Sequence, residues 1–179
     1  LVIAGSTNMA GAALFCAQAA YVGGCGLVRL FTSEANRVIL QSTLPEAILT
    51  TYQETDAEAE IIKVNEALAQ AIAWADVIAL GPGLGRSRTA CRIAEQVLLT
   101  ADIPVIADAD ALNIIAEKTE LLASASAALV VTPHLGEMAR LCGRQIPDIQ
   151  NSLRSTAEQF AARYHVICVL KDAVTVTAG

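Results

Sequence analysis

The amino-acid sequence predicts an α/β domain in which a mostly parallel β-sheet lies between two layers of helices. Short apolar runs alternate along the chain with longer segments of helical period. Several of these runs are apolar at every position, which is typical of parallel strands covered on both faces. Alternation of strands and helices produces open sheets with helices on both sides, so we expect a three-layer αβα architecture.

The apolar runs predict the strands. They occupy residues 1–4, 27–32, 48–52, 76–80, 104–107, 128–132 and 166–170, and residues 174–177 are a further candidate. Residues 9–28 form the most membrane-like stretch, but four glycines and Gln18 interrupt it. A membrane-spanning helix needs about 20 strongly apolar residues. We therefore interpret residues 9–28 as a buried helix, starting near Gly11, that is followed by a turn.

The segments between these strands predict helices. In residues 58–73, 87–99 and 152–164 the apolar side chains recur every three or four positions and share one face. Asp110 precedes an Ala-Leu-Asn sequence and is expected to cap a short helix. Another helix is expected to start directly after His134.

Length, charge and cysteine content limit the class of protein. A chain of 179 residues suits one domain, spanning residues 1–179. The net charge of −6, the 4% aromatic content and the lack of a Lys/Arg cluster argue against nucleic-acid binding. The five cysteines are odd in number and contain no C-x-x-C pair. We therefore expect reduced, mostly buried thiols in a cytoplasmic protein, with neither a disulfide framework nor a zinc site.

Small or functional residues follow nearly every predicted strand. The carboxyl ends of parallel strands meet at one edge of the sheet, where ligands bind. The sequence Gly-Pro-Gly-Leu-Gly at residues 81–85 would let the backbone approach a ligand, with Ser87 opening a helix that could hold an anion. It matches neither the Walker loop nor G-x-G-x-x-G, and a simple tight turn is the alternative.

Charged residues at the same edge have both functional and structural interpretations. Asp108 and Asp110 could hold magnesium through water or orient a substrate hydroxyl, but helix capping would also explain Asp110, and Asp108 could be a solvated or paired carboxylate. His134 could contact a ligand or serve as a helix-entry residue. Glu137 lies in a first helical turn, where a negative charge is favoured by roughly 0.3–1 kcal/mol, and could pair with Arg140 three residues later. Lys171 could neutralise a phosphate or be an ordinary surface lysine.

Together and in this order, six segments resemble one family, the ADP/ATP-dependent NAD(P)H-hydrate dehydratases, which have the ribokinase-like fold. The matching segments are "GSTNMAGAALFCAQAAYVGGCGLVRL", "LPEAI", "ADVIALGPGLG", "PVIADADALN", "TPHLGEMARL" and "VLKDAVTV". The resemblance implies a lyase that repairs hydrated NADH or NADPH. Such enzymes use ADP or ATP, with Mg²⁺, to phosphorylate the ring hydroxyl and then eliminate phosphate. The resemblance also implies a homo-oligomer with no nucleic-acid or membrane partner.

The resemblance assigns roles to particular residues. Ala12, Gly83 and His134 would contact the hydrated dinucleotide. The AMP portion of the nucleotide would be lined by Lys171, Asp172, Ala173, Val174 and Thr175. Other residues that could line the site are Asp108, Asn113 and Glu137.

Two departures from the family pattern affect these expectations. The family usually has Lys-Gly-Ala where this chain has Lys171 and Asp172 before an alanine, and an aspartate there would repel phosphates unless it points away. The family also has a downstream Gly-Ser/Thr-Gly-Asp motif, whose aspartate is the expected base, and the chain ends at Gly179 before any such motif. The resemblance therefore implies a domain that is incomplete at its C-terminal end.

Two other functions are compatible with the sequence. One is a different ribokinase-like enzyme, such as a small-alcohol kinase of vitamin metabolism, which would release a stable phosphorylated product. The other is a non-catalytic nucleotide-binding module, for which ligands would raise thermal stability without turnover. The segment "TPHLGE" favours the dehydratase over another kinase.

We expect the purified 179-residue chain to show no dehydratase turnover by itself, because it contains no match to the expected catalytic aspartate. The measurement is recovery of reduced nicotinamide from the hydrate in the presence of ADP or ATP. Recovery of the reduced cofactor by this chain would show that the expectation is wrong.

Overall fold

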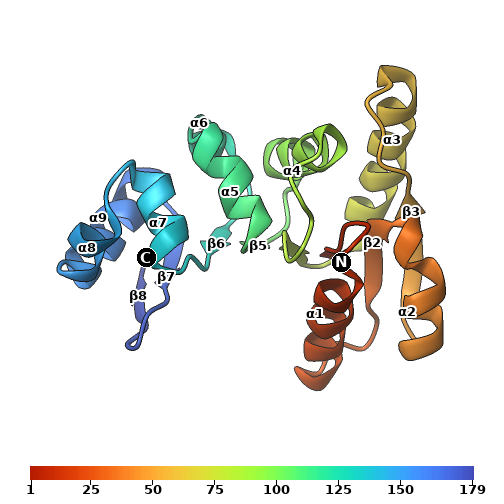
Figure 1. Ribbon diagram of the computed structural model, residues 1–179, viewed down its shortest axis with the longest axis horizontal. Coiled ribbons are helices and arrows are strands. Elements are labelled where there is room, and N and C mark those ends of the chain that lie inside the picture. The colour runs from red at the N-terminus through yellow and green to blue at the C-terminus, as the bar shows by residue number, and fades with distance from the viewer.

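The computed structural model describes residues 1–179 and contains one eight-stranded sheet with the strand order β3-β2-β1-β4-β5-β6-β7-β8 (Figure 1). The strands are β1 Val2–Ile3, β2 Arg29–Ser33, β3 Ile48–Tyr52, β4 Ile78–Leu80, β5 Val105–Ala107, β6 Leu129–Val131, β7 Ile167–Leu170 and β8 Val176–Ala178. Every neighbouring pair is parallel except β7 with β8, which is antiparallel. The predicted, mostly parallel sheet is confirmed.

Helices connect the strands. They are α1 Ala10–Val22, the 3₁₀ helix η1 Glu34–Asn36, α2 Arg37–Thr43, α3 Glu58–Trp74, α4 Arg88–Thr100, α5 Asp110–Glu117, α6 Glu120–Ser124, α7 Leu135–Cys142, α8 Ile146–Gln150 and α9 Leu153–Tyr164. The periodicity predicted α3, α4 and α9 to within one residue at each end. It did not predict η1, α2, α6 or α8, each of which is too short to show a helical repeat.

The order of the strands determines which face each helix covers. From β1 the chain adds β2 and then β3 in one direction, and it returns to place β4 to β7 on the other side of β1. Right-handed crossovers in opposite directions put their helices on opposite faces of a sheet. Accordingly, α1 and α2 lie on one face and α3 to α9 on the other (Figure 1). The predicted three-layer α/β architecture is confirmed.

Each face of the sheet has its own hydrophobic core. The larger core lies under α3 to α9 and includes the fully buried side chains of Leu80, Ile93 and Leu112. The smaller core lies under α1 and α2 and includes Leu30 and Leu40. At about 25 cal/mol per Å² of apolar surface, such burial is the main favourable contribution to folding.

The expectation that the apolar strands are covered on both faces is wrong for β5 and β7. Their registers place Ile106, Val130 and Ile167 side by side on the face that carries α1 and α2. Ile106 is 40% exposed and Ile167 is 45% exposed. Because α1 and α2 extend only over the other half of the sheet, no helix of this chain covers these side chains (Figure 1).

Helix α1 also differs from the expectation of a buried helix. Only Ala13 and Ala17 are buried, whereas Phe15 is 70% exposed and Val22 is 90% exposed. The apolar side chains surround the helix, so packing one stripe against the sheet leaves the others in solvent. No helix in the structure is long and apolar enough to cross a membrane.

The cysteines are less buried than expected. All five are free, but only Cys168 is buried, Cys25 is exposed and the remaining three are half-buried. Burial raises the pKa of the Cys168 thiol to about 12. At neutral pH this thiol is therefore protonated and unreactive.

An ion pair joins the end of β2 to β3. The Glu34 carboxylate accepts hydrogen bonds from the Arg37 Nε at 2.6 Å and Nη2 at 2.9 Å, and from the Thr51 hydroxyl. The hydrogen bond from Arg37, followed by that from Thr51, lowers the pKa of Glu34 from its ordinary 4.5 to about 2. The folded state therefore stabilises the ionised form of the Glu34 carboxyl group.

This pKa predicts an acid-sensitive contribution to stability. A carboxylate with a lowered pKa in the folded state stabilises fully above its ordinary pKa of 4.5, and this stabilisation is lost as pH falls toward about 2. We expect Glu34→Gln to lower the free energy of unfolding at pH 6. The difference in free energy of unfolding between this variant and the wild type should become smaller as pH falls. Urea unfolding at several pH values measures this, with Glu66→Gln, an exposed glutamate, as the control for loss of one carboxylate. A wild-type advantage that is the same at pH 6 and pH 3 would contradict the prediction.

Candidate functional site

Two loops meet where the strand order reverses between β1 and β4. Gly5 donates its N–H to the Pro82 carbonyl at 2.9 Å, and Ser6 donates to the Gly83 carbonyl at 2.6 Å. Gly83 has φ +63°, and a Cβ at this position would lie 2.7 Å from the Ala12 Cβ. Ala12 and Gly83, which were predicted to contact the same substrate, are therefore packed together at the carboxyl edge of the sheet. In open α/β sheets, ligands bind in the crevice at such a reversal.

A buried asparagine that no sequence motif indicated supports this loop. Asn36 is fully buried, and its Nδ2 donates to the Thr32 hydroxyl at 2.9 Å and to the Ser6 carbonyl at 3.2 Å. Thr32 in turn donates to the Gly5 carbonyl at 3.1 Å. Asn36 lies in a 3₁₀ turn of three residues with no periodic pattern, so its burial could not be read from the sequence.

His134 forms the N-terminal cap of α7. Its Nδ1 accepts the N–H groups of Gly136 at 2.9 Å and Glu137 at 3.4 Å, while the Glu137 carboxylate accepts the His134 N–H at 2.9 Å. This reciprocal arrangement is a capping box. Because Nδ1 is an acceptor, a neutral His134 ring carries its proton on Nε2. The structural interpretation of His134 is therefore correct, and the ring is still 55% exposed at the edge of the sheet.

Lys171 lies directly beside His134. Its N–H donates to the Pro133 carbonyl at 2.8 Å, which makes a parallel bridge between His134 and Lys171. The Lys171 ammonium is 2.9 Å from a carboxylate oxygen of Asp108. Both side chains remain partly exposed, at 40% and 34%. Asp108 is thus a paired carboxylate, and the pair lies at the end of β5 and β7.

The expectation that Asp110 caps α5 is wrong. The cap position is Ala109, which has φ +53° and no side-chain hydrogen bond, and Asp110 is the first residue of the helix. The Asp110 carboxylate accepts the N–H of Gly85 at 2.9 Å and lies 3.4 Å from the Nδ2 of Asn113. It therefore joins the glycine loop to α5, because the sharp turn at Ala109 directs Asp108 and Asp110 to different partners.

The predicted pair of Glu137 with Arg140 is also absent. Glu137 is only 5% exposed and its carboxylate is used in the capping box. Arg140 instead donates its Nε to the Oδ1 of Asn113 at 2.9 Å. A continuous series of hydrogen bonds therefore runs from Gly85 through Asp110 and Asn113 to Arg140.

The predicted AMP-binding residues form the turn between β7 and β8. Asp172 is half-buried, while Ala173, Val174 and Thr175 are exposed. The turn projects from the edge of the sheet (Figure 1). Asp172 makes no ion pair with Lys171, which is held by Asp108 instead.

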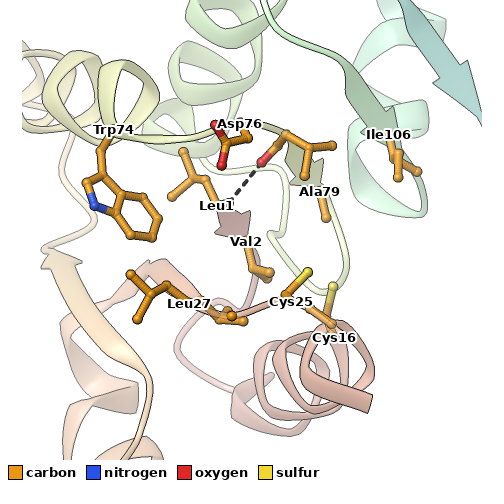
Figure 2. Close-up of a pocket in the computed structure, with 13 residues that line it drawn as sticks. Leu1, Val2, Cys16, Cys25, Leu27, Trp74, Asp76, Ala79 and Ile106 are labelled. Atoms are coloured by element: carbon orange, nitrogen blue, oxygen red, sulfur yellow. Dashed lines mark hydrogen bonds between the residues drawn. The ribbon is translucent and has the colours of Figure 1, made fainter. Parts of the chain in front are cut away.

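A large cavity lies elsewhere, at the amino ends of β1, β2 and β4 (Figure 2). It has a volume of about 780 Å³ and is lined mostly by apolar side chains, among them Val2, Trp74 and Ile106. Near its wall the Leu1 amino group donates to the Val77 carbonyl at 2.9 Å (Figure 2). None of the predicted site residues lines this cavity, and it offers few hydrogen-bond donors for a phosphate. We therefore place the candidate site at the carboxyl edge, where the ionised groups gather.

Structural comparison defines the class of protein. The chain superimposes on a ribokinase-like superfamily protein from Enterococcus faecalis V583 with a TM-score of 0.80 and 27% identity, over 99% of this chain and 58% of that chain. The carboxyl edge described above thus belongs to a ribokinase-like fold.

Sequence comparison is more specific. The profile of the NAD(P)H-hydrate dehydratase family matches residues 1–179, and the chain belongs to that family. It is 35% identical over 178 residues to the bifunctional NAD(P)H-hydrate repair enzyme Nnr of Moorella thermoacetica, and this covers 99% of the chain but 34% of that relative. It is also similar to the ADP/ATP-dependent NAD(P)H-hydrate dehydratase of Bacillus subtilis, which was co-crystallised with ATP and Mg²⁺. That structure has a TM-score of 0.75 and 30% identity, and the match covers 99% of this chain and 58% of that one.

We expect Gly83→Ala to destabilise the protein more than Gly143→Ala. The two glycines have nearly the same backbone conformation, with φ of +63° and +62°. Either alanine would cost roughly 1 kcal/mol of backbone strain. A Cβ at Gly83 would also press on Ala12 at 2.7 Å and Met9 at 2.9 Å, whereas nothing lies within 4 Å at Gly143. Such overpacking costs a further 1–3 kcal/mol, roughly.

Chemical unfolding of both variants measures this difference. Equal losses of stability would show that the packing of Gly83 against α1 is loose, contrary to the close contact described above.

Proposed function

We propose that this chain supplies the hydrate- and nucleotide-binding residues of a protein that carries out the ADP- or ATP-dependent dehydration of hydrated NADH or NADPH. In this reaction the ring hydroxyl is phosphorylated, and loss of phosphate then restores the ring double bond. Family membership supports the proposal, and the observation that carries it is the position of His134 and Lys171. These two motif residues are 37 positions apart in the sequence, yet they form neighbouring positions at the carboxyl edge.

The residues of the β7–β8 turn fit a nucleotide. The Lys171 ammonium is partly exposed and can face a phosphate without complete loss of its Asp108 partner. Val174 is 67% exposed and offers apolar surface that a base could cover. Lys171, Ala173, Val174 and Thr175 would therefore hold the AMP portion, with Asp172 half-buried beside them. When bound, ADP or ATP would supply the phosphoryl group.

Magnesium would enter with the nucleotide. The structure contains no group of three or more His, Cys, Asp or Glu side chains placed to hold a metal ion. Mg²⁺ commonly keeps several waters and binds through phosphates and one or two carboxylates. We therefore assign the ion to the nucleotide phosphates and assign no protein residue as its ligand.

The chain's own residues would act mainly by positioning and by charge. Phosphoryl transfer depends on these two effects more than on covalent chemistry. Gly83 and Ala12, which are packed together, would border the dinucleotide, and the exposed His134 ring would contact it. Lys171 would neutralise charge that develops on the transferred group. Asp108 and Asp110 are engaged by Lys171 and Gly85, so we do not assign either as the base that removes the hydroxyl proton.

We also propose a homo-oligomer located in the cytoplasm. Phe15, Val22 and Val38 are 70%, 90% and 77% exposed, and apolar surface of this extent on α1 and α2 is typical of an association surface. The five free cysteines support a reducing compartment.

The test is an assay of the full-length gene product with the hydrate, Mg²⁺ and either ADP or ATP. We expect the absorbance of the reduced nicotinamide and free phosphate to appear together. Lys171→Met should lower the rate by roughly a hundredfold, because removal of one charge-stabilising donor commonly costs that much. Lys63→Met, which removes a surface lysine paired with Glu60, is the matched control and should leave the rate unchanged.

Each alternative gives a different result in this assay. Accumulation of a stable phosphorylated product without reduced nicotinamide would indicate a small-molecule kinase. Nucleotide binding with no turnover would indicate a binding module. Either result would reject the proposed dehydratase.

A further inference from the structure

Arg140 is a cation at the carboxyl edge that has no acidic partner. Lys171 at this edge is paired with Asp108, and Arg37 is paired with Glu34. Arg140 forms no ion pair, and its only side-chain hydrogen bond is from Nε to the Asn113 Oδ1 at 2.9 Å. The glutamate one turn before it is withdrawn into the capping box of α7. The guanidinium therefore keeps four N–H donors that no protein group accepts.

The guanidinium of Arg140 lies close to the His134 ring. A Cβ at Gly136 would be 2.9 Å from the His134 Cε1 and 3.7 Å from the Arg140 Nη1. Both groups thus border the same space, which a side chain at Gly136 would fill. The Arg140 guanidinium and the His134 ring therefore lie on the same side of the α7 N-terminus.

The position of Arg140 is fixed relative to the glycine loop. Asn113, which accepts the Arg140 hydrogen bond, lies 3.4 Å from the Asp110 carboxylate, which in turn accepts the N–H of Gly85. A long arginine side chain usually loses considerable rotamer entropy when it binds a ligand. Here Asn113 already holds the guanidinium at the edge, so less entropy remains to be lost.

We propose that Arg140 binds a phosphate of the dinucleotide pyrophosphate, and this inference rests on the function proposed above. A guanidinium presents parallel N–H groups that match two oxygens of a phosphate. Arg140 lies beside His134 and is joined to the loop of Gly83, the two sides assigned to the dinucleotide. The phosphates of ADP or ATP could be bound by a guanidinium in the same way. We assign Arg140 to the dinucleotide because Lys171, in the β7–β8 turn, is already assigned to the nucleotide phosphates.

The test compares ligand binding by calorimetry in the full-length gene product. The probes are NADPH, a reduced dinucleotide that carries the same pyrophosphate as the hydrate, and ADP, each titrated separately. We expect Arg140→Gln to weaken NADPH binding by about tenfold, because a hydrogen bond to a charged group contributes that much. The ADP affinity should not change. Arg140→Lys keeps the positive charge but not the parallel N–H groups of the guanidinium, so its NADPH affinity should lie between those of the wild type and Arg140→Gln.

Arg154→Gln is the matched control. This arginine pairs with Glu158 on the exposed surface of α9 and contacts none of the residues assigned to the dinucleotide, so its loss removes one positive charge without removing a proposed ligand contact. It should leave both affinities unchanged. The NADPH affinity of the wild type should also fall with salt between about 50 and 300 mM, and the fall should be smaller for Arg140→Gln.

The outcomes separate this inference from the proposed function. If the wild type binds NADPH and recovers reduced nicotinamide from the hydrate, but Arg140→Gln binds NADPH equally well, the inference is wrong and the function stands. If Arg140→Gln weakens ADP binding instead, Arg140 serves the nucleotide and the inference is also wrong. A wild-type protein that binds no dinucleotide would contradict both.

Discussion

Two backbone hydrogen bonds join the two loops at the point where the strand order of the sheet reverses. They join Gly5 to Pro82 and Ser6 to Gly83, and so bind the loop after β1 to the loop after β4. The helices that follow these loops leave toward opposite faces, because their crossovers run in opposite directions. A crevice at the carboxyl edge is the geometric result. The two cores and the order of the polar groups along the edge all depend on this one reversal.

Most polar groups along the carboxyl edge support the loops and helices around it. Asn36 and Thr32 hold the first loop from beneath, and Asp110 holds the glycine loop through Gly85. Glu137 is used to cap α7, at a position where a carboxylate also interacts favourably with the helix dipole. Because Glu137 is used in this way, the Arg140 guanidinium has no acidic partner. The buried polar groups thus support the loops, and of the cations described at this edge Lys171 and Arg37 are paired with carboxylates while Arg140 is not.

Local patterns in the sequence predicted much of this arrangement. Ser87 was expected to open α4, and its hydroxyl accepts the N–H of Ala90 at 3.2 Å, a contact between near neighbours in the chain. The wrong predictions of side-chain pairing concerned partners that are distant in sequence. A spacing of three residues suggested that Glu137 pairs with Arg140, but the partner of Arg140 is Asn113 on another helix. Asp110 looked like a local cap, and its partner is Gly85, 25 residues earlier.

The sequence by itself determined the parallel α/β class and the family, because apolar periodicity and contiguous motifs are local properties of a chain. It also determined which residue types follow each strand. Only the tertiary structure decided that His134 and Lys171 adjoin, that Lys171 pairs with Asp108, and that one face of β5 and β7 lies open. These features depend on strand order and on the sharp turn at Ala109, which bring together groups with no fixed separation along the chain. The spacing of residues along the chain does not predict such pairings, because they are set by which strands and loops become neighbours in the fold.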